Sequence, residues 1–276
     1  METSQRTIGL SCAFLIASCF PAFAQLEVSS GFSFVTPMGE FNQIVESLWG
    51  HKGGQRGIGG EVKADWGLGK QSALKFGVFG DVLFIGFGNG TRGDPFGTSE
   101  IESYKFSTMG EKSTRLNLLM ISSGISISPR RGSLRPYGEF FGGITSYSNS
   151  SSLFRVFLTG GSGSVTVPPA FRKPYYPESE PLRIEDRTWH AGFTAGLKFL
   201  MWPPDQESEK DKFLKQIFID WSFSYARSGY LEYFDEASIL PESGLFIPDQ
   251  TVILTHEMLE SRIEILKMRI SLTFGF

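Results

Sequence analysis

Apolar and polar side chains alternate one by one along several segments of this chain, most clearly at its C-terminal end. From Leu266 to Phe276 every second residue is apolar, and the residues between them are polar or glycine. Successive side chains of a β-strand point to opposite faces, so this spacing predicts a strand with one apolar face. The same alternation predicts strands at about 26–34, 58–66, 74–84, 189–199 and 217–225. Two more are expected at about 115–127 and 136–146, where the apolar face is ambiguous.

The connections between these expected strands differ in length in a regular way. Short connections are expected near 68–72, 128–135 and 202–213, and long ones near 37–56, 86–113, 147–186 and 227–261. In an up-and-down antiparallel sheet, alternate connections lie at opposite ends, so all the long ones fall at one end and both termini at the other. This predicts an all-β fold, a closed antiparallel up-and-down barrel of about eight strands. The segment 153–167 leaves room for an extra hairpin, so ten strands stay an alternative.

The composition favours a barrel that crosses a membrane. Mean hydropathy is only −0.07, and no segment after residue 24 has the roughly 20 apolar residues that a membrane-spanning helix needs. A β-barrel crosses a bilayer at average hydropathy because only every second residue faces lipid. The chain is 14% aromatic, and Trp66, Trp189, Phe274 and Phe276 are expected near the two membrane interfaces. A soluble barrel with the opposite facing is the alternative.

The first 24 residues have the features of a secretory signal peptide. Arg6 is followed by an apolar stretch from Ile8 to Ser18, and Ala22 and Ala24 form an A-x-A cleavage site. The expected mature protein is therefore a single barrel domain, 25–276. Both cysteines lie in the expected signal peptide, which excludes disulfide, thiol and Cys-zinc chemistry from the mature chain. Residues 16–19 also resemble a lipoprotein box, in which Cys19 would carry lipid.

Two short stretches resemble a known family. Alternating apolar residues that end in Phe274 and Phe276 resemble the last strand of bacterial outer-membrane barrels, and 135–143 resembles a Pro-Tyr and Gly-rich strand of the small OmpA/OmpX/OmpW-like families. This resemblance implies location in the cell outer membrane of a Gram-negative bacterium, contact with its lipids, and a C-terminal signal read by the barrel-assembly machinery. It implies no particular subfamily.

The polar faces of the expected strands are rich in charges of both signs. Because an unpaired charge is costly in a low-dielectric lumen, we expect these groups to pair and fill an eight-stranded barrel, which is just wide enough for side chains. The expected lumen charges are Glu27, Glu61, Lys63, Asp65, Lys75, Asp81, Lys198, Asp220, Lys267 and Arg269, with Glu139 as a further candidate.

The sequence carries few residues suited to catalysis or to binding a cofactor. His51, His190 and His256 are the three histidines and could meet at the mouth, but His190 lacks the His-x-Ser pattern of an outer-leaflet lipid deacylase. Gly86–Gly90 precedes no helix pattern, which argues against a phosphate loop. A net charge of −3 argues against nucleic acid.

We therefore predict a barrel without catalytic, cofactor or metal site, with a structural or recognition role through long extracellular loops. Loop aromatics would form a binding surface there or pack the loops together; they are Phe154, Phe157, Tyr175, Tyr176, Tyr230, Tyr233 and Phe234. The alternatives are a narrow pore, a path for small apolar molecules, and an outer-leaflet lipid-modifying enzyme. An unknown extracellular ligand is the expected partner.

Overall fold

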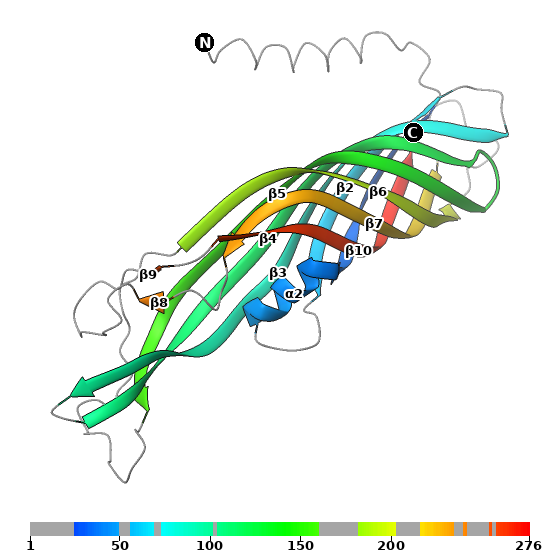
Figure 1. Cartoon of the computed structure of the whole chain (residues 1–276). Helices are drawn as coiled ribbons and strands as arrows, with labels where there is room; N and C mark the ends of the chain where they lie inside the picture. Colours follow the sequence, from blue (N-terminus) through cyan, green and yellow to red (C-terminus); the bar gives the residue numbers. More distant parts are fainter. Residues whose placement is uncertain are drawn as a thin grey trace, which may run out of the picture.

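Eight antiparallel strands close into one barrel in this computed structural model (Figure 1). The structure describes residues 25–49, 56–68, 73–101, 104–159, 182–202, 216–234, 240–241, 254–255 and 258–276. The barrel strands are β1 (Gln25–Met38), β2 (Gly57–Leu68), β3 (Leu74–Ile101), β4 (Tyr104–Pro129), β5 (Leu134–Thr159), β6 (Leu182–Trp202), β7 (Gln216–Phe234) and β10 (Met258–Gly275). The expected fold class is confirmed.

The first and last strands close the barrel. They pair antiparallel from Glu27 opposite Gly275 to Met38 opposite Glu264. The amide of Phe276 donates a further hydrogen bond of 2.8 Å to the carbonyl of Leu26. Because a closed sheet leaves no edge within the membrane, every strand of the wall has two hydrogen-bonded neighbours there. We call the end that holds Gln25 and Phe276 the base, and the opposite end the mouth.

Three strands continue far beyond the others at the mouth, where long loops were expected. Pairing of β2 with β3 ends at Gly86 and pairing of β6 with β5 ends at Ser151, yet β3 and β4 stay paired out to Ile101 and Tyr104. The predicted loop at 86–113 is therefore wrong. The predicted loop at 147–186 is wrong for residues 147–159, which belong to β5. The alternating pattern reflects a lipid-facing side, so it ends where the strand leaves the bilayer, although backbone pairing continues.

The ten-strand alternative is wrong for the barrel. Residues 153–159 belong to β5 itself. The two remaining short strands, β8 (Leu240–Pro241) and β9 (Leu254–Thr255), pair with each other in a separate sheet.

A helix replaces part of the first expected loop. Helix α2 (Gly39–Trp49) follows β1 at the mouth and lies beside β10, β1 and β3 (Figure 1). Its side chains Phe41, Ile44 and Val45 are buried against the barrel, which is the i, i+3, i+4 spacing of one helix face. Gly39 starts the helix with φ of +56°, a conformation that favours glycine. Helix α2 was not expected from the sequence, because one apolar face over three turns is a short signal.

The distribution of side chains is inside-out relative to a soluble protein. Exposed apolar residues cover the outside of the wall, as the alternation predicted: Phe32 is 70% exposed, Ile125 61% and Phe140 68%. The polar residues between them, such as Ser33 and Ser126, are buried in the lumen. The facing of β4 and β5, which the sequence left ambiguous, is now fixed with Ile125 and Phe140 outside.

The lumen is divided into a polar half and an apolar half. Its base half holds the charged groups. Its mouth half is a hydrophobic core in which Val35, Ile85, Leu118 and Ile265 line the wall and Phe41 of α2 fills the centre. The expectation that paired charges fill the lumen is therefore corrected for the mouth half, which apolar side chains fill. The run Val82–Ile85, in which both faces of β3 turn apolar, marks the change in the sequence.

Candidate functional site: the lumen and its mouth

Glu27 joins three strands at the base of the lumen. Its carboxylate accepts from the Nζ atoms of Lys75 at 2.7 Å and Lys198 at 2.6 Å. Lys75 also lies 3.6 Å from Asp65. All four side chains are at most 9% exposed, and each comes from an inward position of its strand. Since β1 and β6 are not neighbours in the barrel, these contacts connect opposite walls.

Arg269 organises a second cluster. Its two terminal nitrogens donate to Glu61 at 2.6 Å and to Asp220 at 2.8 Å, and Lys267 donates to the same Glu61 at 2.6 Å. Tyr137 completes the cluster, because its hydroxyl donates to Asp220 at 2.7 Å and accepts from Arg269 at 2.8 Å. Tyr137 was absent from the expected set. A tyrosine at an inward position one residue after Pro136 was the available signal.

Lys63 pairs with Glu139 across the lumen and lies over the ring of Phe79, 4.1 Å from its centroid. Asp65 accepts from Ser126 at 2.8 Å. Every charge that the sequence placed in the lumen is thus buried there, and the ion pairs and hydrogen bonds above account for nine of the ten.

The tenth charge is Asp81, whose Oδ1 atom, like Oδ1 of Asp65, has no hydrogen-bond partner among the described residues. It lines a cavity of about 10 Å³ with Ser122, Phe141 and Lys267, at the boundary between the polar and apolar halves. That volume is room for about one water molecule.

His190 lies inside the wall, and its side chain is held on both nitrogens. Nε2 is 3.0 Å from the hydroxyl of Ser122 and Nδ1 is 2.9 Å from that of Thr145. A Ser–His contact is one part of a hydrolase site, but the group that orients this histidine is a threonine, and the residue is only 2% exposed. His51 and His256 lie outside the described residues, so the prediction that the three histidines meet at the mouth stays untested.

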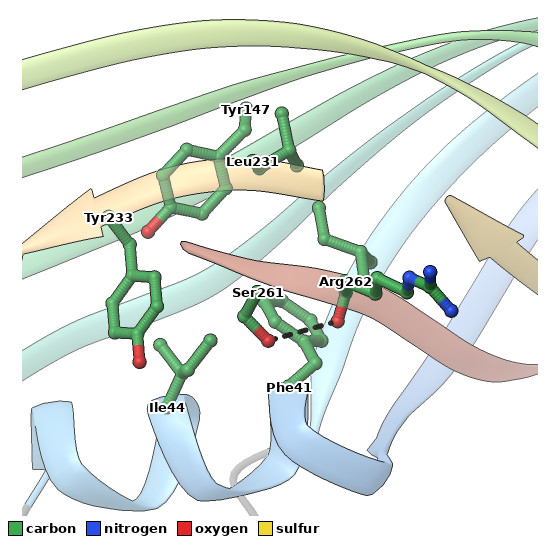
Figure 2. Close-up of a pocket in the computed structure, with 8 residues that line it drawn as sticks. Phe41, Ile44, Tyr147, Leu231, Tyr233, Ser261 and Arg262 are labelled. Carbon is green, nitrogen blue, oxygen red and sulfur yellow. Dashed lines mark hydrogen bonds between the residues drawn. The ribbon is translucent and has the colours of Figure 1, made fainter. Parts of the chain in front are cut away.

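A small cavity remains at the mouth between α2 and the wall (Figure 2). Phe41 and Ile44 project from the helix toward Tyr147 of β5, Leu231 and Tyr233 of β7, and the 261–263 segment of β10. The cavity is small, about 10 Å³, and its lining is mostly apolar. Phe41 also meets the ring of Phe87 edge-on, with centroids 5.6 Å apart. The helix therefore closes the mouth by packing, while ion pairs close the base.

Several expectations concern residues that the structure does not describe. Cys12, Cys19, Ala22 and Ala24 precede the described residues, and Tyr175 and Tyr176 lie in a gap. Among the described residues no group of three or more His, Cys, Asp or Glu is arranged to hold a metal ion. The described helices include none with the length and apolar character that crossing a membrane demands.

The closed barrel and the inside-out wall decide the class of protein. A soluble barrel would bury Phe32, Ile125 and Phe140 and expose Glu61 and Arg269, which is the reverse of what is found. The chain is a small closed β-barrel with the apolar outer wall of a transmembrane barrel. The alternative of a soluble barrel with reversed facing is wrong.

Comparison with known structures finds outer-membrane proteins at very low sequence identity. Ail, the attachment invasion locus protein of Yersinia pestis, is 11% identical with a TM-score of 0.39 over 91% of this chain and 98% of its own. Neisserial surface protein A is 9% identical, with a TM-score of 0.41 over 91% and 97%. The outer membrane protease OmpT of Escherichia coli is 8% identical, with a TM-score of 0.40 over 92% and 97%. No family model and no curated protein matches the sequence.

Proposed function

We propose that this barrel resides in the bacterial outer membrane, conducts no ions, and serves in recognition through the sheet that β3, β4 and β5 extend beyond its mouth. The observation that carries this proposal is the contrast between a filled lumen and a projecting sheet. Ion pairs such as Glu27–Lys198 bridge the base of the lumen, and α2 packs into its mouth. The recognition surface is then the sheet of β3, β4 and β5 that extends beyond the mouth of the barrel.

The projecting sheet is long enough to reach well past a lipid leaflet. From Gly86 to Ile101, β3 continues for a length of about 50 Å at roughly 3.4 Å per residue, and it stays paired with β4 apart from register shifts between Gly86 and Asn89 and between Pro95 and Gly97 (Figure 1). Hydrogen bonding to β4 gives this part of the protein a fixed shape, which a recognition surface needs and an isolated loop lacks.

A second candidate function is transport of a small apolar molecule, because the mouth half of the lumen is apolar. Such transport would require α2 to move out of the mouth and the ion pairs at the base of the lumen to break. Cross-lumen pairs buried to a few per cent exposure make this path the less supported of the two. An enzymatic role is supported less again, since the Ser122–His190 contact is buried.

The proposal is tested in two steps. Purified protein in planar bilayers should show no conductance steps, and membrane fractions should show gel mobility that changes on boiling, as folded barrels do. A shortened variant should lack residues 91–113 and join Gly90 to Thr114 through Asn-Gly, because these two residues are direct partners in the β3–β4 hairpin.

Cells that display the full or the shortened protein are then compared for retention on surfaces coated with collagen or with heparin. Retention that needs residues 91–113 supports recognition by the projecting sheet. Stable single-channel conductance, or equal retention of both forms, would contradict it.

A further inference from the structure

The outward face of the wall changes from apolar to charged at one level near the mouth. On β7 the outward residues from Ile217 to Tyr225 are apolar or aromatic, and the next is Arg227. On β10 the outward residues from Phe276 to Leu266 are apolar, and the next is Glu264. Each apolar run matches the roughly nine to eleven residues that a tilted strand uses to cross the hydrocarbon. Arg227 and Glu264 therefore lie at the level of the lipid headgroups on the mouth side.

An irregularity in strand pairing gathers more polar groups at this level. The β7–β10 register shifts between Arg262 and Glu264, and the amide of Ile263 donates to the hydroxyl of Ser228 at 2.9 Å. As a result Tyr230, 56% exposed, lies on the outside directly opposite Arg262. Bulges of this kind re-aim side chains, and here the bulge brings two arginines and a tyrosine to one patch.

The patch encloses a cavity of about 160 Å³ on the outside of the wall. It is lined by Arg227, Tyr230, Arg262 and Glu264 from the strands and by Gly39 and Glu40 from the start of α2. We call it the headgroup cavity. It is distinct from the apolar cavity at the mouth, although Arg262 borders both. Figure 2 shows the Arg262 side chain pointing away from the helix residues of the apolar cavity.

Both carboxylates of the headgroup cavity already have partners. Glu264 Oε1 binds Nε of Arg227 at 2.8 Å. Glu40 Oε2 accepts from Ser261 at 3.3 Å, and Glu40 lies in the first turn of α2, where the helix dipole stabilises negative charge. The Arg262 guanidinium lies 4.3 Å from the centroid of the Tyr230 ring, and within the described part of the chain no carboxylate pairs with it.

We propose that the headgroup cavity binds a phosphate group of a lipid headgroup in the leaflet at the mouth, an inference that rests on the membrane placement proposed above. At this level the arginines lie beside the phosphates of the lipid headgroups, and a planar guanidinium matches phosphate with two parallel hydrogen bonds. Stacking on Tyr230 holds Arg262 in one orientation, which reduces the entropy lost on binding. Arg227, whose side chain is 49% exposed, supplies the second positive charge.

The test uses the full chain in detergent micelles and three probes: lipid A with its phosphates, lipid A without them, and inorganic phosphate. Binding is measured as the rise in unfolding temperature, read from gel mobility with and without heating. Phosphorylated lipid A should stabilise the protein, and the other two probes should not. Arg262→Gln should weaken the affinity for lipid A by about tenfold or more, as expected for loss of a charge-assisted contact.

Two variants complete the design. Arg183→Gln removes an exposed arginine of β6, outside the cavity, and should bind lipid A like the wild type. Arg262→Lys keeps the positive charge but loses the planar guanidinium that can donate two parallel hydrogen bonds, and should bind lipid A with intermediate affinity. If Arg262→Gln fails to fold, Arg262→Lys carries the comparison.

The proposal fails if Arg262→Gln and Arg262→Lys bind lipid A as tightly as the wild type does, or if lipid A without phosphates stabilises equally. Equal stabilisation by inorganic phosphate would identify a site for the free ion and overturn the lipid assignment. Failure of the membrane placement is recognised separately, because the protein would then stay monodisperse without detergent and its mobility would not change on boiling.

Discussion

The carboxylate of Glu27 lies 2.6 Å from the ammonium group of Lys198, although the two residues are 171 positions apart in the chain. Glu27 is on β1 and Lys198 on β6, so the contact crosses the lumen instead of following the wall. The same carboxylate holds Lys75 of β3. One side chain thus ties together three strands that are not neighbours, which is possible only in a barrel as narrow as this one.

Replacing Glu27 by Gln should destabilise the barrel strongly. The change keeps the volume of the side chain but leaves Lys198 without its carboxylate and Lys75 with the more distant Asp65, and breaking a buried pair costs about 3–5 kcal/mol. The measurement is the urea midpoint of the protein folded in lipid vesicles. Glu185→Gln is the control, because it breaks an exposed pair with Arg183 and should change stability by no more than about 0.5 kcal/mol. Equal effects of the two changes would contradict a structural role for the lumen pairs.

An arginine in place of Ile270 should cost about 2–4 kcal/mol. Ile270 is 48% exposed on the outside of β10, opposite Phe32 of β1, and lies in the middle of the apolar run. Unfolding in vesicles measures the effect. Leu259→Arg is the control, because it also replaces an apolar residue of β10 by arginine. Leu259 lies on the mouth side of Glu264, outside the hydrocarbon, so this change should cost no more than about 1 kcal/mol. A cost near zero for Ile270→Arg would mean that this face does not meet lipid.

Phe41→Ala should loosen the helix without opening the barrel. The Phe41 side chain is 1% exposed and packs against Phe87, so its removal should lower stability by up to about 3–5 kcal/mol. Gln43→Ala, on the exposed face of α2, is the control and should be nearly neutral. Conductance in planar bilayers should stay absent in both variants, because the ion pairs at the base remain. Conductance steps in Phe41→Ala alone would show that α2 is the principal barrier.

Deletion of Phe276 should impair assembly of the barrel while export continues. The residue ends the alternating C-terminal strand, and its amide hydrogen-bonds to Leu26 of β1 where the barrel closes. The yield of protein with heat-modifiable mobility is the measurement, with total exported protein quantified beside it. Phe276→Tyr keeps an aromatic terminus and should assemble normally. A normal yield from the deletion would argue against an assembly signal at this position.

Prediction from the sequence succeeded where one physical requirement repeats along the chain. Each spanning strand must place apolar groups toward lipid and polar groups toward the lumen, so the alternation around Ile270 and Arg269 is visible in the sequence by itself. The inward position of ten charged residues and the closed eight-stranded topology follow from that alternation. The projecting hairpin did not follow, because beyond Gly86 the strand no longer has a lipid-facing side to impose a pattern.

The tertiary structure decided which groups meet. The alternation of the sequence shows that Glu27, Lys75 and Lys198 point into the lumen. Their contact depends on the order and register of the strands in the closed barrel, which bring these distant residues to the same level. Likewise, the apolar face of α2 around Phe41 can be buried only because the inward residues of β1, β3 and β10 are apolar at the same level of the barrel. The sequence by itself determined the faces of the wall, because each face meets its own solvent. The pairing across the lumen and the patch around Arg262 required the three-dimensional fold, because they depend on distances between strands.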